Sequence, residues 1–396
     1  MNKKISLGMA VALMAIASAV AVAITMVAST ATFNSKLANI NERQAIYEKI
    51  TEINKIVREN YNGEIDESVL LDHISSGFTD GLGDTWAEYY TVQEYNDLKD
   101  DLSGKVVGIG VSYTKDTEGY ARITTVYEDS PAMAAGLQKG DQIIKVGETD
   151  VLTAYQEALS AVKGNAGTAV TLTYRRGGEE TTVEMTRRKV TVPSVQLQML
   201  ESDIACIRIT EFSSNTVGQF EKALSTALDR ADGIIFDIRN NTGGTVKATA
   251  KILDMILPEG PIVSSTDKAG KTKVLYTSDS AEVDLPMVVL VNKNTASAAE
   301  LFAAALRDYD KAKLVGSNTY GKGVMQDIYP LSDGSAIKIT TAKFNPPKSD
   351  NFNGVGLKPD FVVDLSAEQE KQWYELDNTN DPQFIKALSV VKAIYK

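Results

Sequence analysis

The chain has 396 residues, enough for about two to three domains and for a hydrophobic core that needs no disulfide staples. Acidic residues outnumber basic ones by 52 to 41, and a net charge of −11 argues against a nucleic-acid-binding protein. The single cysteine, Cys206, and the single histidine, His73, exclude a disulfide framework, a thiolate metal cluster and a two-histidine zinc site. We expect His73 to be structural, so a hydrolase built on this chain would use a different base.

The N-terminus reads as a membrane signal. Lys3 and Lys4 precede the uncharged run Ile5–Ala28, which would measure about 36 Å as a helix, long enough to span a bilayer. The two lysines would keep the short N-terminus in the cytoplasm. We therefore expect a single-pass anchor in the cell membrane, with the rest of the chain on the extracytoplasmic side. A cleaved signal peptide ending near Ser29-Thr30-Ala31 is the alternative.

Helical periodicity follows this run. Apolar residues recur at threes and fours over 34–66, with charges on the other face, and this pattern predicts an amphipathic helical arm. The arm would pack on its own chain or form a dimer. A second helix is predicted over 67–79.

Residues 101–190 change to a β-rich pattern. We predict strands, a short helix over 130–137 that ends at a glycine, a second helix over 153–163, and a hairpin at Arg176-Gly177-Gly178. From residue 204 onward, apolar strands alternate with helices. The strands are expected at 204–209, 233–238 and 285–291, and the helices at 216–229, 246–257 and 296–307. This alternation predicts an α/β layer architecture.

Ser297 is the first residue with potential chemistry. It lies in Thr295-Ala296-Ser297-Ala298-Ala299-Glu300, after a buried strand and in the first turn of a helix, where unpaired N–H groups favour developing negative charge. An ordinary helix-capping serine is the alternative.

Gly243 and Gly244 follow the buried strand that ends in Asp237-Ile238-Arg239-Asn240-Asn241. Strand ends that meet helix N-termini are where α/β sheets gather their sites, so these glycines could offer N–H groups to an oxyanion. An ordinary connecting loop is the alternative.

Lys322 lies between Gly321 and Gly323, and Gln326 would share a strand face with it and could hold its amine. With an ordinary pKa of about 10.4, only about one lysine in 2,500 is neutral at pH 7. A base therefore needs a pKa lowered by burial, and it needs to be free of an acidic partner. The nearest acid in sequence, Asp327, is expected on the opposite strand face. An exposed turn lysine is the alternative.

Taken together, these blocks resemble the carboxy-terminal processing peptidases, also called tail-specific proteases. The resemblance covers nearly everything after the N-terminal run. Its specific blocks are Gly108-Ile109-Gly110-Val111, Ser130-Pro131-Ala132, Gly140-Asp141-Gln142-Ile143-Ile144, the Asp237–Gly244 and Thr295–Glu300 segments, Gly321-Lys322-Gly323 with Gln326, and Gly356-Leu357-Lys358-Pro359-Asp360.

The resemblance implies a fold and a domain order. It implies an α/β protease core of the crotonase and Clp-protease β-β-α type, with an inserted PDZ domain and an N-terminal helical arm. The domains are expected as anchor or signal peptide over 1–33, arm and first part of the core over 34–100, PDZ domain over 101–190, and serine protease core with a C-terminal helix over 191–396.

The resemblance also implies roles. Ser297 would be the nucleophile, Lys322 the general base and Gln326 the residue that orients the lysine, while Gly243 or Gly244 would join the backbone of the catalytic turn in an oxyanion hole. In the PDZ domain, the N–H groups of Gly108, Ile109 and Gly110 would hold a substrate's terminal carboxylate, and the chain end would add as a strand beside Val111. No metal and no cofactor are expected.

Three positions depart from the family pattern: Thr242 replaces a usual proline, Lys163 a frequent arginine, and Leu82-Gly83-Asp84-Thr85 a Leu-Asp-Pro-like turn. We expect a serine endopeptidase, with no cofactor, that cleaves exported or membrane proteins near their C-termini. Its partners would be polypeptide C-termini, the membrane through the N-terminal helix and a second copy, with no nucleic acid. The alternatives are an inactive PDZ scaffold and, less well supported, an acyl-CoA-binding relative of the crotonases.

Overall fold

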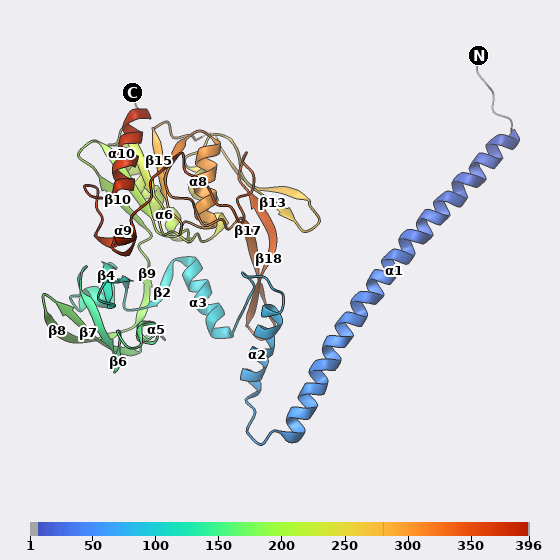
Figure 1. Cartoon of the computed structure of the whole chain (residues 1–396), viewed down its shortest axis with the longest axis horizontal. Helices are drawn as coiled ribbons and strands as arrows, with labels where there is room; N and C mark the ends of the chain where they lie inside the picture. Colours follow the sequence, from blue (N-terminus) through green and yellow to red (C-terminus); the bar gives the residue numbers. More distant parts are fainter. Residues whose placement is uncertain (1–6, 280, 395–396) are drawn as a thin grey trace, which may run out of the picture. The chain divides into compact units, whose positions relative to one another are not determined.

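The structure is a computed structural model that describes residues 7–279 and 281–394. The chain divides into two compact units, one ending at Leu71 and the other beginning at Asp72. The first unit consists mainly of one long helix, and the second contains all the predicted site residues (Figure 1).

The long helix is α1 (Leu7–Asn60), which runs without interruption through the segments predicted as anchor and arm. It ends earlier than the predicted limit of 66, because Asn60, Asn62 and Gly63 favour turns, and Asp66 then caps α2 (Glu67–Asp80) by accepting hydrogen bonds from two of its amides. No helix among the described residues is both long and apolar enough to cross a membrane. The anchor predicted over Ile5–Ala28, whose first two residues lie outside the described part, is therefore not supported.

The β-rich module is built around a sheet with the strand order β3-β4-β5-β7-β8, in which β6 pairs with β5. The strands are β3 (Val111–Lys115), β4 (Ala121–Val126), β5 (Gln142–Val146), β6 (Thr149–Asp150), β7 (Ala169–Arg176) and β8 (Glu179–Thr186). Two short helices, α4 (Pro131–Ala134) and α5 (Tyr155–Ser160), lie between the strands in sequence. A two-stranded ladder of β2 (Lys105–Gly108) and β9 (Arg188–Thr191) closes the module. The strand β3 is left at an open edge of the sheet.

The central sheet of the second unit has the order β10-β11-β12-β15-β16-β19. Its strands are β10 (Val195–Met199), β11 (Ile204–Ile209), β12 (Gly233–Asp237), β15 (Met287–Val291), β16 (Ala312–Gly316) and β19 (Phe361–Val362). All neighbours pair in parallel except β10, which runs antiparallel to β11. The predicted strand at 204–209 and the alternation of strands and helices are confirmed.

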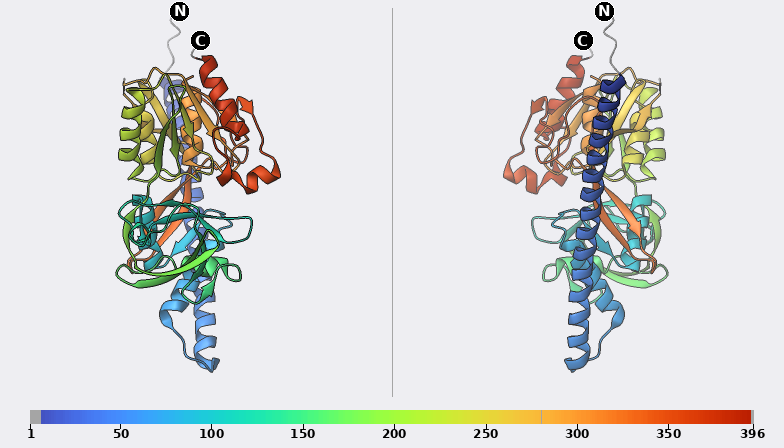
Figure 2. Two further views of the ribbon diagram at one scale, coloured as in Figure 1. Left: turned by 90° about the vertical axis from the view of Figure 1, so that its left-hand side faces the viewer. Right: turned by 90° about the vertical axis from the view of Figure 1, so that its right-hand side faces the viewer.

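Helices cover both faces of this sheet, as Figure 2 shows, with α6 and α7 on one side and the red α10 on the other. The helices are α6 (Thr216–Leu228), α7 (Val246–Asp254), α8 (Ala298–Asp308), α9 (Ala367–Lys371), the short 3-10 helix η1 (Trp373–Glu375) and α10 (Pro382–Ile394). Alternate strand residues explain the two layers: Ile234 and Phe236 pack in the cluster with α6, α7 and α8, whereas Ile235 packs with α10.

A third sheet has the order β1-β18-β13-β14, and β17 also pairs with β18. Its strands are β1 (Glu88–Tyr90), β13 (Gly260–Asp267), β14 (Thr272–Ser278), β17 (Val324–Pro330) and β18 (Ala336–Asn345). The helix α3 (Val92–Ser103) connects β1 to the β-rich module. Because β1 joins β18, the segment that precedes the β-rich module lies beside the strands that follow Lys322.

Candidate active site

Ser297 occupies the turn between β15 and α8, at the end of the central sheet. Its backbone has φ of 58° and ψ of −120°, a conformation that glycine adopts easily and that other residues rarely do. The other non-glycine residues with positive φ in the described part of the chain are aspartates or asparagines, which tolerate it: Asp129, Asp203, Asn240 and Asp310. Such strain costs about 1–3 kcal/mol and is typical of functional turns, including those that present a serine nucleophile.

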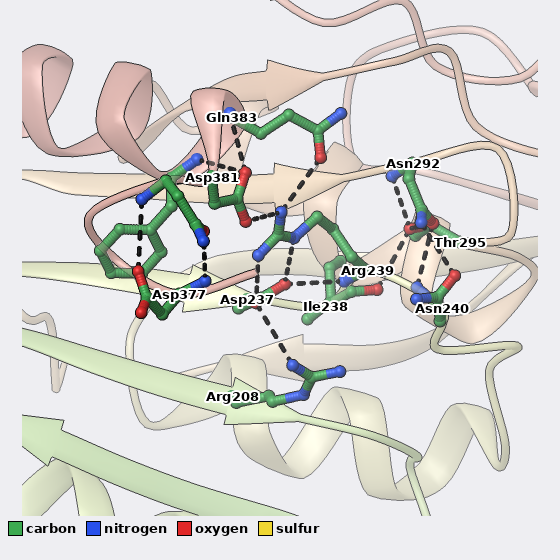
Figure 3. Close-up of polar contacts among 12 residues, drawn as sticks. Arg208, Asp237, Ile238, Arg239, Asn240, Asn292, Thr295, Asp377, Asp381 and Gln383 are labelled. Atoms are coloured by element: carbon green, nitrogen blue, oxygen red, sulfur yellow. Dashed lines mark hydrogen bonds and ion pairs between the residues drawn. The ribbon is translucent and has the colours of Figure 1, made fainter. Parts of the chain in front are cut away.

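Polar contacts tie the turn before Ser297 to the loop after β12 (Figure 3). Asn292 accepts a hydrogen bond from the Asn240 amide at 3.0 Å through Oδ1, and its Nδ2 donates to Asn240 Oδ1 at 2.9 Å. The Thr295 hydroxyl donates to the carbonyl of Ile238 at 3.1 Å, and the Ala296 amide donates to the carbonyl of Asn241 at 3.0 Å. The two loops are therefore held together as one rigid support for Ser297.

A second network in Figure 3 fixes the end of β12 to α10. The Arg239 guanidinium donates two hydrogen bonds to the carboxylate of Asp237, at 2.9 and 2.8 Å, and one to Asp381 at 2.6 Å. The Arg239 and Arg208 guanidinium groups hold the pKa of Asp237 down to about 2, although its burial acts in the opposite direction. Asp381 in turn accepts hydrogen bonds from the first amides of α10 at Gln383 and Phe384.

Gly243 lies directly against the Ser297 turn. A Cβ atom at Gly243 would be 2.9 Å from the Ala296 carbonyl oxygen and 3.0 Å from the Ser297 Cβ, so only glycine allows this approach. The Gly243 amide already donates to Asn241 Oδ1 at 2.8 Å. Gly244 faces Phe212 instead, and within the described residues neither its amide nor that of Ala298 donates a hydrogen bond.

Glu300 connects the serine turn to the lysine loop. Its Oε2 accepts hydrogen bonds from the amides of both Ser297 and Lys322, each at 2.8 Å, so the two nitrogens are at most twice that distance apart. Its Oε1 accepts from the Gly321 amide at 2.7 Å and from the Thr319 hydroxyl. The side chain is fully buried, and burial raises the pKa of Glu300 while these four donors lower it.

The Lys322 side chain is half-buried, and its Nζ lies 3.8 Å from the centroid of the Trp86 indole. Burial lowers the pKa of Lys322, the positive charge of Lys338 lowers it further, and Asp84 opposes both. Lys322 forms no ion pair among the described residues. Asp84, which the sequence analysis did not single out, is the acid whose charge acts on this amine. Asp327, expected to face away from the lysine, accepts a hydrogen bond from the Thr341 hydroxyl.

Gln326 does not bind the lysine in this structure. Its Nε2 donates to the carbonyl of Val324 and to the hydroxyl of Thr340, both at 3.3 Å, and no hydrogen bond joins it to Lys322. The prediction that the two residues share a strand face assumed a strand through both, but β17 begins only at Val324.

The predicted carboxylate-binding loop lies at the open edge of the β-rich module. Gly108, Ile109, Gly110 and Val111 line one pocket of about 190 Å³ together with the residues that follow α5. The carbonyls of Ile109 and Gly110 accept hydrogen bonds from Ala132 and Tyr127, but their amides donate none within the described part of the chain. Both amides therefore lack an internal acceptor, although the two residues are buried.

Sequence reasoning missed two residues next to the site. Glu300 stands in the quoted Thr295–Glu300 block and was given no role; an acid three residues after a turn serine is the signature of a capping box, which could have drawn attention to it. Trp86 is separated from Lys322 by most of the chain, and no local pattern marks it.

Comparisons with known proteins identify the class. The family model of Peptidase family S41 matches residues 203–363, and that of the PDZ domain matches residues 122–176. A Staphylococcus aureus (strain MSSA476) protein named Probable CtpA-like serine protease is 34% identical over 342 residues, covering 85% of this chain and 68% of that protein. A protein of the same name from Staphylococcus haemolyticus (strain JCSC1435) is 33% identical over 378 residues, covering 92% of this chain and 75% of its own.

The chain therefore belongs to peptidase family S41 and is a serine-type peptidase with a PDZ domain, so the resemblance to the C-terminal processing peptidases is confirmed. Solved structures agree. The photosystem II D1 C-terminal processing protease aligns with a TM-score of 0.51 at 26% identity, over 87% of this chain and 91% of its own. A Bacteroides fragilis structure assigned to the S41 proteases aligns with a TM-score of 0.57 at 17% identity, over 81% and 90%, and shows the shared fold alone.

Proposed function

We propose that this chain is a Ser-Lys endopeptidase that cleaves polypeptides near their C-termini. The observation that carries the proposal is the shared Glu300 carboxylate, which brings the strained turn of Ser297 and the loop of the half-buried Lys322 to one point. A serine activated by a neutral amine needs no histidine, in keeping with the single His73.

The reaction follows from these groups. The neutral amine of Lys322 accepts the proton of the Ser297 hydroxyl while the oxygen attacks the scissile carbonyl. The developing oxyanion would be stabilised by backbone amides without an internal partner, those of Gly244 and Ala298, beside Gly243. The lysine then returns its proton to the leaving amine, and a water hydrolyses the acyl-enzyme by the same route. Gln326 would orient the amine once it turns toward Ser297.

Tail capture is the second part of the proposal. A substrate end would add as a strand beside β3, an open edge of the PDZ sheet, with its carboxylate at the amides of Ile109 and Gly110. An enzyme that holds chain ends in this way selects substrates by their free C-terminus rather than by internal sequence.

Catalysis is tested with the substitutions Ser297→Ala and Lys322→Ala in the full chain, assayed on casein. Each should lower turnover by at least 10³-fold without loss of the folded state, because both remove a reacting group. Ser225→Ala, at an exposed position on α6, is the matched control and should retain wild-type turnover. Cleavage by Ser297→Ala at the wild-type rate would exclude this assignment, and a wild-type chain without activity would favour the scaffold alternative.

Capture is tested separately by binding, with the Ser297→Ala chain and a fluorescent peptide. A peptide with a free carboxylate should bind at least tenfold more tightly than its C-terminal amide, since charge-assisted hydrogen bonds to the loop amides are lost in the amide. Equal affinities would contradict tail capture and leave the peptidase assignment intact.

A further inference from the structure

The amine of Lys322 has an aromatic neighbour that the proposed reaction does not use. Its Nζ lies 3.8 Å from the indole centroid of Trp86, within the range of a cation–π contact. It makes no hydrogen bond to Gln326, Ser297 or any other described residue. Among the described residues, the direct contact of the Lys322 amine is therefore with the indole ring of Trp86.

The position of Trp86 is set by the chain around it. The amide of Trp86 donates to Asp84 Oδ1 at 3.0 Å, and Asp84 Oδ2 accepts from the Thr340 amide of β18 at 3.1 Å. Two residues later the chain enters β1, which pairs with β18. The ring of Tyr320 meets the indole edge-on, with centroids 6.0 Å apart. The indole is thus fixed to β18. The same strand pairs with β17, which begins directly after the Lys322 loop.

The contact depends on the charge of the lysine. A cation–π contact stabilises the ammonium form and contributes little to the neutral amine, because the ring quadrupole attracts positive charge. The neutral amine is the form that can accept a proton from a serine. The indole therefore stabilises the ammonium form of Lys322, which cannot accept a proton, and binds the neutral amine, which can, only weakly.

We propose that Trp86 is a positioning residue of this peptidase, whose indole seats the protonated side chain of Lys322 and releases it to the Ser297 turn when the proton leaves. The inference rests on the proposed Ser-Lys function and deepens it. Other charged groups face the same amine. They are Lys338 on β18 and Asp84 before β1. Two further titratable groups lie nearby: the Glu300 carboxylate, which binds the backbone amide of Lys322, and Tyr320, which contacts the Trp86 ring.

The first test is the pH dependence of kcat/KM in full-length variants. Trp86→Leu keeps an apolar side chain but removes the π face, so the acidic limb should move to lower pH by roughly half a unit to one unit. Trp86→Phe keeps an aromatic face, so its acidic limb should shift by less than half as much as that of Trp86→Leu.

The matched control is Trp373→Leu. Trp373 is the second tryptophan of the chain, and it also holds a cation, with the Arg208 guanidinium 4.8 Å from its ring. Its removal should leave the limb where it is in the wild type. The inference is overturned if Trp86→Leu leaves the limb unmoved or moves it to higher pH, which would show that the indole only excludes water. It is overturned equally if Trp86→Phe shifts the limb as far as Trp86→Leu.

A second test does not depend on catalysis. In a Trp373→Phe chain, Trp86 is the remaining indole, and its emission should change as the amine of Lys322 loses its proton. Adding Lys322→Met should abolish this transition, and a flat titration in the presence of Lys322 overturns the inference. If Ser297→Ala cleaves casein as well as the wild type, the proposed function fails, while the fluorescence titration still decides whether Trp86 seats the lysine.

Discussion

Glu300 shows how one buried residue can position two distant ones. It carries no reacting atom, yet its carboxylate accepts hydrogen bonds from the amides of Ser297, Gly321 and Lys322. The Gly321 bond is buried and the other two are partly buried, so each of these amides needs an acceptor where water has little access.

We predict that Glu300→Gln lowers kcat/KM by about 10²-fold and the free energy of unfolding by about 1–3 kcal/mol. The amide group offers one oxygen in place of two, so at least one backbone N–H loses its acceptor and the two loops separate. Kinetics and urea unfolding measure both effects. Glu221→Gln, at an exposed position on α6, is the control. Wild-type kinetics in Glu300→Gln would contradict the role given to this carboxylate.

Lys338 gives a prediction on pH. Its positive charge lowers the pKa of Lys322, while its own ammonium is held by Glu88 and Tyr90. In the proposed reaction Lys322 must be neutral, so kcat/KM is expected to fall as the pH falls through the pKa of Lys322. Lys338→Gln removes the repelling charge, raises that pKa and should move the acidic limb to higher pH.

Lys273→Gln removes the same charge at an exposed position of β14, on the opposite edge of the third sheet, and should leave the limb unmoved. A shift to lower pH in Lys338→Gln, or equal shifts in both variants, would contradict the electrostatic role of Lys338.

The sequence predicted those parts of the site that depend on residues close together in the chain. A serine after a buried strand and before a small-residue helix does lie in a strand-to-helix turn, and Gly243, the first glycine of the pair after the neighbouring parallel strand, does lie beside it. The sequence left open whether Gly243 or Gly244 would serve an oxyanion, and no local pattern predicts that Asn241 accepts a hydrogen bond from the Gly243 amide. The Gln326 contact was predicted by strand alternation, which does not apply outside the strand.

At the scale of elements, the buried strands and their helices were predictable because each carries one apolar face at the proper period. The sheet of β13, β14, β17 and β18 was not, since these strands are partly exposed and their partners lie far away in sequence. The helix α3 was also missed, because none of its residues is buried and no apolar periodicity marks it.

The joint between β12 and α10 is the element-level contact with the clearest energetic consequence. Arg239→Ala would leave the buried carboxylate of Asp381 without its ion pair and Asp237 with the more distant Arg208 guanidinium alone, which costs about 3–5 kcal/mol. Urea unfolding at pH 7 measures the loss. Arg208→Ala, whose guanidinium is 3.8 Å from Asp237, should cost less. Equal losses would show that Arg239 is not the main partner.

Acid should weaken the same joint in the wild type. The pKa of Asp237 is lower in the folded chain, about 2, than in the unfolded chain, about 3.9. The pairing therefore stabilises the fold fully above the unfolded value, and this contribution disappears as the pH falls toward 2.

At the scale of the whole molecule, every candidate site residue lies in the unit that begins at Asp72. We predict that a fragment of residues 62–396, which lacks α1 and keeps α2 whole, folds and retains casein cleavage within about threefold of the full chain. Circular dichroism and kinetics check this. A folded fragment with less than a tenth of the activity would show that α1 contributes to catalysis. The extracytoplasmic location and the dimer stay predictions.

The pairing of β1 with β18 has a consequence for the way the enzyme is made. Glu88 and Lys338, which meet across it, are 250 residues apart, and Trp86 enters the site through the same pairing. Nearly the entire polypeptide must therefore leave the ribosome before the Trp86 ring can contact the Lys322 amine. Contacts so distant in sequence form slowly. A partly synthesised chain therefore lacks the contact between Trp86 and Lys322, whatever else of the core has already folded.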